Sequence, residues 1–342
     1  MPPPSASSSF SPAAPFLPFP TAIEPIFICP GTGEPLQFVE PAAAGEPGAL
    51  VSPSGRRYAV KGGVARFVPD DVYASNFGMQ WNTFSRTQLD RYNGTTISRD
   101  RFRLVTGWDL GNLAGKRVLD AGCGAGRFAQ IALDAGAEVV AVDLSSAVDA
   151  CQANLGPHPR LTVVQASIYD LPFPPASFDF VYSIGVLQHT PDVERAVKAL
   201  PPMLRPGGRL ACWIYEHKPT AFMTPRYPLR ALTTRMPQDR LFRLLQRWVP
   251  PMLKVSDACA AVPLLGPYLR KLVPVANYKG ILPLTPEQRD EWALLDTFDW
   301  FAPAYDQPQT WPTVERWLRE AGCSDIRRIG GRRIGLPVTA TR

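Results

Sequence analysis

Three glycines spaced two residues apart follow a carboxylate, and together they form the part of the sequence best suited to holding a ligand. Residues 117–128 read RVLDAGCGAGRF, so Asp120 precedes Gly122, Gly124 and Gly126. Glycines at a turn between a strand and a helix let the main chain bend tightly and let a ligand approach it closely. A second carboxylate, Asp143, ends the apolar run that begins at Glu138. It lies about 20 residues beyond the first glycine, where an acid that binds a ribose diol is expected.

The glycine spacing differs from that of a dinucleotide site. A dinucleotide fingerprint would place its third glycine at position 127, but that position holds Arg127 and the third glycine comes one residue earlier. Asp120 would repel a pyrophosphate, whereas it suits a cationic ligand. A nicotinamide oxidoreductase is therefore an alternative, but Arg127 at the third glycine position argues against it.

In these features the chain resembles the class I methyltransferases, which use S-adenosylmethionine (SAM). Their signature is a strand, the pattern Asp-x-Gly-x-Gly-x-Gly and an acid that ends the second strand. SAM carries a sulfonium, an ammonium, a carboxylate and a ribose diol but no phosphate, which suits acids at the ends of both strands. The resemblance implies SAM as the cofactor, S-adenosylhomocysteine as the product, no metal, and a cofactor site made of Asp120, Gly122, Cys123, Gly124, Gly126, Asp143, Leu144, Ser167, Ile168 and Ser183.

Two further segments match this family. Residues 165–173 resemble the segment that cradles adenine, although the family often has Asp where this chain has Ser167. The Ser167 hydroxyl can also accept a hydrogen bond from the adenine amino group. Residues 182–192 resemble the turn after the family's fourth strand, which is expected at 178–183 in this chain. In the family this turn lines the methyl-transfer chamber. The resemblance covers residues 70–216 well and the C-terminus less well.

His189 lies in that turn and is the candidate catalytic residue. An imidazole titrates near neutrality, so it can take the proton of a hydroxyl as the oxygen attacks. An equally weighted alternative is that His189 hydrogen-bonds the backbone and shapes the turn. The side chains expected to contact the substrate are Trp81, Tyr215, Tyr305 and Asp306.

Strands and helices are expected to alternate around these residues. After the strand that ends at Asp120, strands are expected at 138–143, 161–166, 178–183 and 209–215, and helices at 127–135, at 146–154 and from Thr190-Pro191 onward. A last helix at 311–321 and closing strands at 325–329 and 334–339 come after a long insertion. The alternation predicts an α/β fold with a doubly wound, seven-stranded, mostly parallel sheet and a helical insertion after strand five.

The chain is expected to divide into six parts. Residues 1–25 form a disordered tail rich in Pro, Ser and Ala, and residues 26–70 resemble a degenerate zinc-ribbon knob in which Cys29 lacks partner cysteines, so no structural zinc is expected. The other parts are a helical lid at 71–114, a SAM-binding Rossmann-like core at 115–216, a helical insertion at 217–307 that caps the substrate, and the rest of the core at 308–342. Six prolines should interrupt the helices of the insertion: Pro225, Pro228, Pro237, Pro250, Pro251 and Pro263.

The insertion is strongly basic. From Lys218 to Lys279 there are eleven Lys or Arg and two acids, although the whole chain carries a formal charge of only +6. This composition suits a cap for an anionic substrate or a peripheral contact with a membrane, and a solvated basic face would explain it about as well.

The composition of the 342-residue chain also indicates the cellular compartment of the protein. The six cysteines are scattered rather than closely paired, which suits a reducing environment. No apolar run is long enough to span a bilayer, and the N-terminal segment lacks targeting features. We therefore expect a cytoplasmic protein.

These features predict a SAM-dependent methyltransferase that acts on a small-molecule, glycan or lipid-intermediate acceptor at oxygen. Methyl transfer is an in-line displacement that needs alignment and exclusion of water, so the sequence does not name the acceptor. No Asp/Asn-Pro-Pro-aromatic motif follows the strand expected at 178–183. Its absence disfavours the exocyclic amines of nucleobases as methyl acceptors and makes nucleic acid an improbable partner. The alternatives are a nucleic-acid methyltransferase that uses the basic insertion and a non-catalytic SAM-binding partner subunit.

Overall fold

The computed structural model describes residues 27–41, 46–69, 74–217, 225–330 and 335–342. The expected disordered tail, residues 1–25, lies outside the described residues. Within the described ranges, no helix is both long enough and apolar enough to cross a bilayer.

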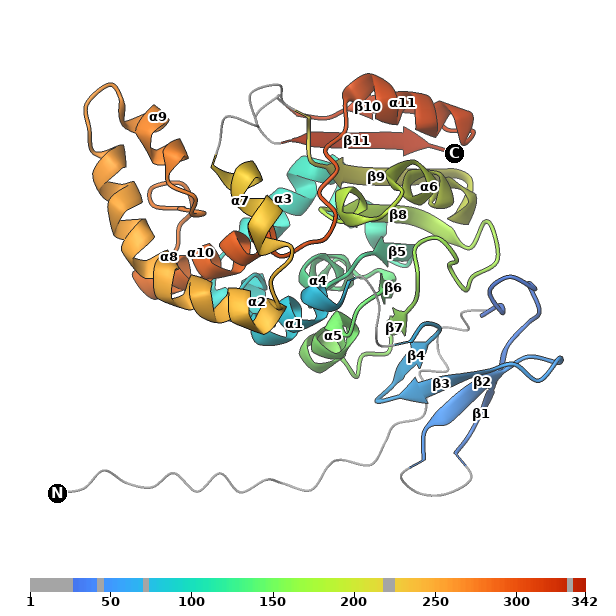
Figure 1. Cartoon of the computed structure of the whole chain (residues 1–342). Helices are drawn as coiled ribbons and strands as arrows, with labels where there is room; N and C mark the ends of the chain where they lie inside the picture. Colours follow the sequence, from blue (N-terminus) through green and yellow to red (C-terminus); the bar gives the residue numbers. More distant parts are fainter. Residues whose placement is uncertain (1–26, 42–45, 70–73, 218–224, 331–334) are drawn as a thin grey trace.

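One mixed β-sheet runs through the molecule (Figure 1). Its strands lie in the order β1-β2-β3-β4-β7-β6-β5-β8-β9-β11-β10. The five central strands from β7 to β9 are parallel, and β11 pairs antiparallel with both β9 and β10. The strand bounds are β1 Gln37–Val39, β2 Gly48–Val51, β3 Arg57–Lys61, β4 Val64–Arg66, β5 Arg117–Ala121, β6 Glu138–Asp143, β7 Leu161–Gln165, β8 Phe178–Ile184, β9 Leu204–Ile214, β10 Ser324–Arg328 and β11 Leu336–Thr341.

The sheet has more strands than the seven expected. The seven expected strands correspond to β5–β11, and the four N-terminal strands extend the same sheet instead of forming a separate knob. Strand β4 pairs parallel with β7, with Val64 opposite Val163, and Val64 and Ala65 are fully buried. The N-terminal strands join because β4 covers the edge of β7, which would otherwise expose unpaired backbone groups.

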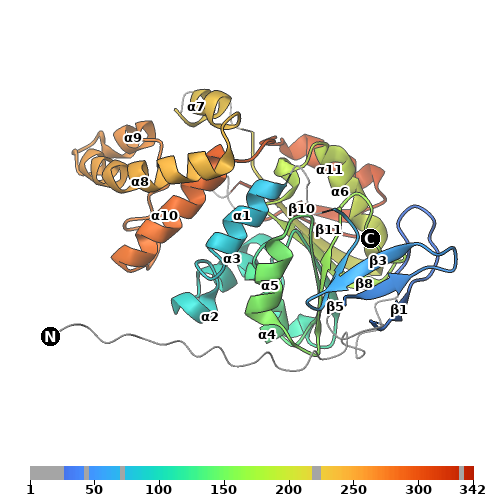
Figure 2. The same cartoon turned by 60° about the horizontal axis from the view of Figure 1, so that its bottom comes forward.

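Helices cover both faces of the parallel strands. Three pack on one face, namely α3 Ile97–Thr106, α4 Arg127–Asp134 and α5 Ala147–Leu155; two pack on the other, namely α6 Val193–Ala199 and α11 Trp311–Glu320. Figure 2 shows the sheet between these two layers. Parallel strands buried on both faces require apolar side chains in both directions, which explains the continuous run Val139–Val142 in β6.

The expected start of a helix at Thr190-Pro191 was wrong. Helix α6 begins at Val193 and is capped by Asp192, whose Oδ1 accepts from the backbone N–H of Arg195 at 2.9 Å. Thr190 is extended, and its hydroxyl donates to the carbonyl of Leu187. His189 therefore ends a separate 3-10 turn, η2 Leu187–His189, instead of directly preceding a helix N-cap.

Helices also form before β5 and after β9. The first group is α1 Ser75–Thr83, α2 Asp90–Asn93 and the 3-10 turn η1 Leu110–Leu113; the second is α7 Arg226–Thr233, α8 Gln238–Ala260, α9 Gly266–Leu269, η5 Arg270–Leu272 and α10 Pro286–Phe301. A further 3-10 turn, η3 Pro201–Met203, precedes β9. Helices α8 and α10 share an apolar core of their own, in which Leu241, Leu245 and Val249 meet Phe298 and Phe301.

The expected interruption of the insertion at Pro250 and Pro251 was also wrong, because both residues lie inside α8. A proline inside a helix removes a backbone hydrogen bond and crowds the preceding turn. Both prolines are exposed, while the opposite face of α8 packs on α10 through Leu245, Val249 and Leu253. We attribute the continuity of α8 to this packing.

Candidate active site

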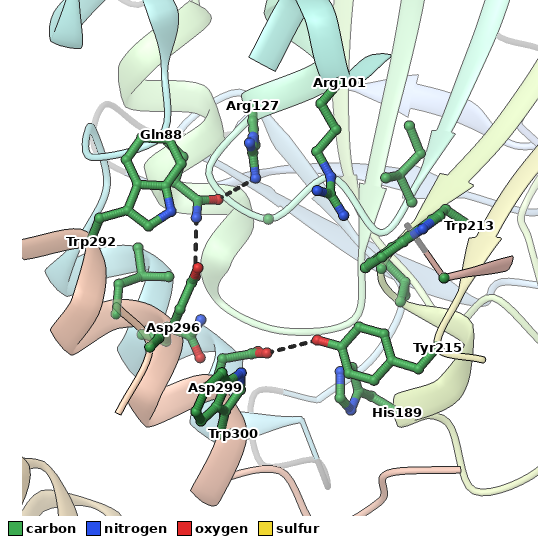
Figure 3. Close-up of a pocket in the computed structure, with 18 of the residues that line it drawn as sticks. Gln88, Arg101, Arg127, His189, Trp213, Tyr215, Trp292, Asp296, Asp299 and Trp300 are labelled. Carbon is green, nitrogen blue, oxygen red and sulfur yellow. Dashed lines mark hydrogen bonds between the residues drawn. The ribbon is translucent and has the colours of Figure 1, made fainter. Parts of the chain in front are cut away.

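A cavity of about 1600 Å³ opens at the carboxyl ends of β5, β6, β8 and β9. The glycine loop after β5 forms one end, and α10 of the insertion forms the opposite wall. Crevices at this edge of a doubly wound sheet are where ligands bind. Figure 3 shows polar and aromatic side chains from α3, α4, β9 and α10 around the cavity.

The glycine loop lines the cavity through Gly122, Cys123 and Gly124. Gly122 has φ +100°, and a Cβ there would lie 2.3 Å from Val186 Cγ2. Gly124 has φ +52°, and a Cβ there would lie 3.1 Å from Trp81 Nε1. Both positions therefore require glycine for conformation and for space. Trp81 also shows that α1 covers this loop.

Asp143 is fixed at the end of β6. Its Oδ2 accepts from the N–H of Gly124 at 2.9 Å, and its Oδ1 accepts from the backbone N–H and the hydroxyl of Ser145 at 2.9 and 2.7 Å. Burial raises the pKa of this carboxyl, and these hydrogen bonds oppose the rise. Asp143 lines the cavity, and each carboxylate oxygen can accept more than one hydrogen bond.

Four of the ten expected cofactor residues do not line the cavity. Gly126 packs against Leu155 at the start of α4, and the Ser183 hydroxyl donates to the carbonyl of Ala121 at 2.7 Å. The hydroxyl of Ser167 accepts from the N–H of Tyr169 at 3.2 Å. The fourth residue is Asp120. The six residues on the wall are Gly122, Cys123, Gly124, Asp143, Leu144 and Ile168.

Asp120 lies behind the wall of the cavity and is 1% exposed. Its Oδ2 has no hydrogen-bond partner among the described residues. Burial raises the pKa of this carboxyl to about 8, and the neighbouring Asp143 contributes in the same direction. At neutral pH Asp120 is therefore mostly protonated.

His189 lies on the cavity wall and is 4% exposed. Its Nδ1 is 2.8 Å from the carbonyl oxygen of Tyr305. A carbonyl only accepts, so Nδ1 must carry the proton, and in the neutral ring Nε2 keeps its lone pair. Nε2 is buried and has no partner among the described residues. The ring lies between those of Phe77 and Tyr215, with centroids at 5.3 and 5.4 Å.

The four expected substrate residues divide into two pairs. Trp81 and Tyr215 line the cavity, whereas Tyr305 and Asp306 do not. Tyr305 acts through its backbone carbonyl, which holds His189. The side chain of Asp306 is 2% exposed, and its Oδ2 lies 2.8 Å from Arg226 Nη2 and 3.9 Å from Arg230 Nε. It thereby ties α7 to the segment that returns to the core.

Helix α10 supplies two acids that the sequence analysis did not select. Asp299 Oδ2 accepts from the hydroxyl of Tyr215 at 3.1 Å. Asp296 accepts from Gln88 Nε2 at 3.2 Å and from the hydroxyl of Tyr278. Burial raises the pKa of Asp296 to about 6. The spacing of Trp292, Asp296 and Asp299 places them on one face of a helix, which was the signal available in the sequence.

Two arginines face these acids (Figure 3). Arg127 donates to Ser98 Oγ at 2.9 Å and to Gln88 Oε1 at 2.7 Å, and burial lowers its pKa to about 10. Arg101 stacks over Trp213 with its guanidinium carbon 4.3 Å from the ring centroid. It makes no ion pair with any residue in the described part of the chain.

The expected zinc-ribbon resemblance of residues 26–70 finds no support. Cys29 is fully buried, and its sulfur lies 3.2 Å from the hydroxyl of Tyr58 and 3.9 Å from Arg56 Nη1. Across the described ranges, no group of three or more His, Cys, Asp or Glu is arranged to hold a metal ion.

Comparisons with known proteins concern the part of the chain that carries the glycine loop. Residues 119–212 match a family model described as a methyltransferase domain. The chain is 37% identical over 120 residues to the O-methyltransferase resE of Aspergillus sclerotiorum, which covers 34% of this chain and 46% of that protein. It is 35% identical over 113 residues to a ubiquinone biosynthesis O-methyltransferase of Xanthomonas euvesicatoria pv. vesicatoria, which covers 32% of this chain and 47% of that protein.

The chain thus spans less than half the length of both curated relatives. A solved S-adenosylmethionine dependent methyltransferase from Mesorhizobium loti is 21% identical, covers 67% of this chain and 92% of that chain, and has a TM-score of 0.40. The family match confirms the expected methyltransferase domain for residues 119–212.

Proposed function

We propose that this protein transfers the methyl group of SAM to a hydroxyl of a small-molecule or lipid-intermediate acceptor. One observation carries the proposal: a single cavity is lined by the glycine loop, Asp143 and His189, whose buried Nε2 has no partner among the described residues. A methyl donor at the loop and an acceptor beside His189 would share this space. The relatives named O-methyltransferases support the choice of reaction.

The loop end of the cavity suits SAM. Gly122 and Gly124 let the methionyl part approach the main chain, and Asp143 can accept from the ribose diol with its remaining lone pairs. Leu144 and Ile168 offer apolar surface for adenine. Asp120, protonated and behind the wall, would support the loop instead of contacting the ligand. SAM supplies the activated methyl group when it is bound.

The opposite end suits an acceptor with a hydroxyl. His189 Nε2 would take the hydroxyl proton while the oxygen attacks the methyl carbon, and Nδ1–H would stay bound to the Tyr305 carbonyl. The Tyr215–Asp299 pair would orient the acceptor from the side of the insertion. Alignment of the two ligands and exclusion of water by the insertion would supply the remainder of the catalysis.

Arg101 narrows the class of acceptor. It is a cation on the cavity wall beside Trp213, and it makes no ion pair within the described residues. An acceptor with a carboxylate or another anionic group on a planar ring would pair with Arg101 and stack on the aromatic side chains. A hydroxylated aromatic acid or its lipid-linked form meets these requirements.

Labelled methyl transfer from SAM to matched acceptors tests the proposal. Hydroxylated aromatic acids should become O-methylated, and analogues that lack the hydroxyl or the acid should react at least about tenfold less efficiently. An Arg101→Gln variant should raise KM for the acids while it leaves KM for SAM unchanged. SAM binding without methylation of any hydroxyl compound would favour the non-catalytic partner instead.

The remaining parts of the chain receive roles within this proposal. Residues 71–114 would form a lid, because Trp81 covers the glycine loop. Residues 115–216 and 308–342 would form the class I core, and 217–307 the substrate cap. The six free cysteines fit a reducing, cytoplasmic environment.

A further inference from the structure

We propose that the insertion docks on an anionic membrane surface through the outer side of α8 and the segment that follows it. Sixteen large apolar side chains are exposed among the described residues, and eleven of them lie between Leu229 and Ile281. Concentrated apolar exposure of this kind marks an interaction surface. We call seven of these side chains the outer cap surface: Leu244, Trp248, Val255, Leu264, Leu265, Tyr268 and Leu272.

Helix α8 presents two parallel stripes to solvent. Leu244, Trp248 and Val255 follow one another at spacings of four and seven residues, so they share one side of the helix. Trp248 and Val255 are each 53% exposed. Arg240, Arg247 and Lys254 recur every seven residues and form a basic stripe beside the apolar one. Apolar and basic stripes side by side are typical of helices that lie in a membrane interface.

The segment after α8 extends the apolar surface. Leu264 is 93% exposed, Leu265 57% and Tyr268 70%. Lys271 follows, and its ammonium lies 5.9 Å from the ring of Tyr268. Figure 1 shows α8 and α9 at the edge of the molecule, beyond α10 and away from the sheet.

The charge of this surface selects an anionic membrane over two other occupants. From Arg240 to Leu272 the only acid is Asp257, which already pairs with Lys279 and Arg289. A second copy of the chain would bring two basic stripes together. A nucleic acid would neutralise the basic stripe but leave Leu264 and Leu265 in water. An anionic lipid surface accommodates both the charges and the apolar side chains.

The outer cap surface borders the mouth of the cavity. Tyr268, Leu272 and Ile281 are exposed and also line the cavity. A lipid-borne acceptor could pass from the membrane into the cavity along these side chains without crossing water. This second step rests on the proposed methyl transfer, whereas the docking itself does not.

Sedimentation of the full chain with lipid vesicles, without cofactor, tests the docking. The probes are vesicles of phosphatidylcholine alone and of phosphatidylcholine with phosphatidylserine. The protein should bind the phosphatidylserine vesicles at least about tenfold more tightly, and added salt should weaken the binding. Arg240→Glu with Arg247→Glu, and separately Leu264→Ser with Leu265→Ser, should each weaken it about tenfold or more.

Matched variants on other surfaces control for nonspecific effects. Lys61→Glu with Lys116→Glu changes the same charge, and Val39→Ser removes an exposed apolar side chain from β1. Both controls should bind vesicles like the unmodified chain. Thermal unfolding should give every variant the melting temperature of the unmodified chain, which shows that each one is folded.

Three results would overturn the docking. The first is that the unmodified chain binds neither kind of vesicle. The second is that the controls lose as much binding as the cap variants. The third is that the unmodified chain binds duplex DNA, or forms dimers through Arg240 and Trp248, and does not bind vesicles. Vesicle binding with no affinity for S-adenosylhomocysteine would instead uphold the docking and reject the proposed methyl transfer.

Discussion

The carbonyl of Tyr305 holds His189 in one tautomer and so leaves Nε2 as the nitrogen that can take a proton. The two interpretations weighed for His189 in the sequence, a base and a backbone-bonded structural residue, are therefore compatible. One nitrogen bonds the backbone, while the other is buried without a partner among the described residues, in a side chain that lines the cavity. The sequence could not show this, because Tyr305 lies 116 residues away.

Replacement of His189 by alanine should lower turnover by roughly 10²–10⁴-fold, because the hydroxyl proton loses its acceptor. The affinity for S-adenosylhomocysteine and the melting temperature should change little. Single-turnover methyl transfer measures the first effect, and calorimetry and thermal unfolding measure the other two. His158→Ala, at a half-buried histidine that does not line the cavity, is the matched control and should be fully active. Near-normal turnover with lost stability in His189→Ala would assign the residue a structural role.

Asp120 should make the ligand-free protein less stable as the pH rises. Burial raises its pKa from 3.8 to about 8, so between these values the folded state holds a proton that the unfolded state releases. Its contribution to stability is thus full below about pH 4 and declines toward pH 8. Asp120→Asn, which stays neutral, should lose less stability than the unmodified chain as the pH rises over this range, by about 1.4 kcal/mol per pH unit at most. Urea unfolding across the pH range measures the difference, and parallel pH curves would contradict the assignment.

At the scale of helices and strands, local patterns predicted most of the core. Helices α4, α5 and α11 and strands β6 to β8 begin and end within about two residues of their expected positions, because their apolar periodicity and their Gly and Ser signals agree. The prediction failed where a distant contact decides the structure. Packing on α10 keeps α8 continuous through two prolines. The start of α6 was missed for a local reason, because Asp192 caps the helix two residues after Thr190.

The acceptor side of the cavity was the least predictable part. Asp296 and Asp299 lie in the expected insertion at 217–307, but from its last residues the sequence analysis selected Tyr305 and Asp306. The partners of the two α10 acids, Gln88 and Tyr215, come from distant parts of the chain. Helical spacing could have grouped the acids, whereas nothing local identifies their partners.

Helix α10 should set the position of the acceptor without affecting SAM. Asp299→Asn weakens the acceptor of the Tyr215 hydroxyl proton, so kcat/KM for the acceptor should fall about tenfold. KM for SAM should stay the same. Asp290→Asn on the same helix is exposed and serves as the matched control. A change in KM for SAM with unchanged acceptor kinetics would show that α10 contacts the cofactor instead.

At the scale of the whole molecule, the N-terminal strands and the core form one continuous sheet. This continuity gives strands β1 to β4 a structural role that needs no metal, since Phe27, Leu50 and Val60 belong to the same apolar core as the sheet. Cys29 is buried beside Tyr58 and Arg56.

The purified protein should therefore contain far less than one zinc per chain. Elemental analysis after gel filtration measures the metal, and an excess of chelator should leave the melting temperature unchanged. A protein with one tightly held zinc per chain, or one that unfolds with chelator, would contradict this expectation.

The central claim is that the glycine loop and Asp143 bind SAM, and calorimetric titration with S-adenosylhomocysteine tests it most directly. The unmodified chain should bind one equivalent and should not bind NADH. Gly124→Val should abolish binding because its side chain would meet Trp81 and occupy the loop end of the cavity. Asp143→Ala should weaken binding by about tenfold or more through loss of the diol contact. Binding of NADH without binding of S-adenosylhomocysteine would contradict the account.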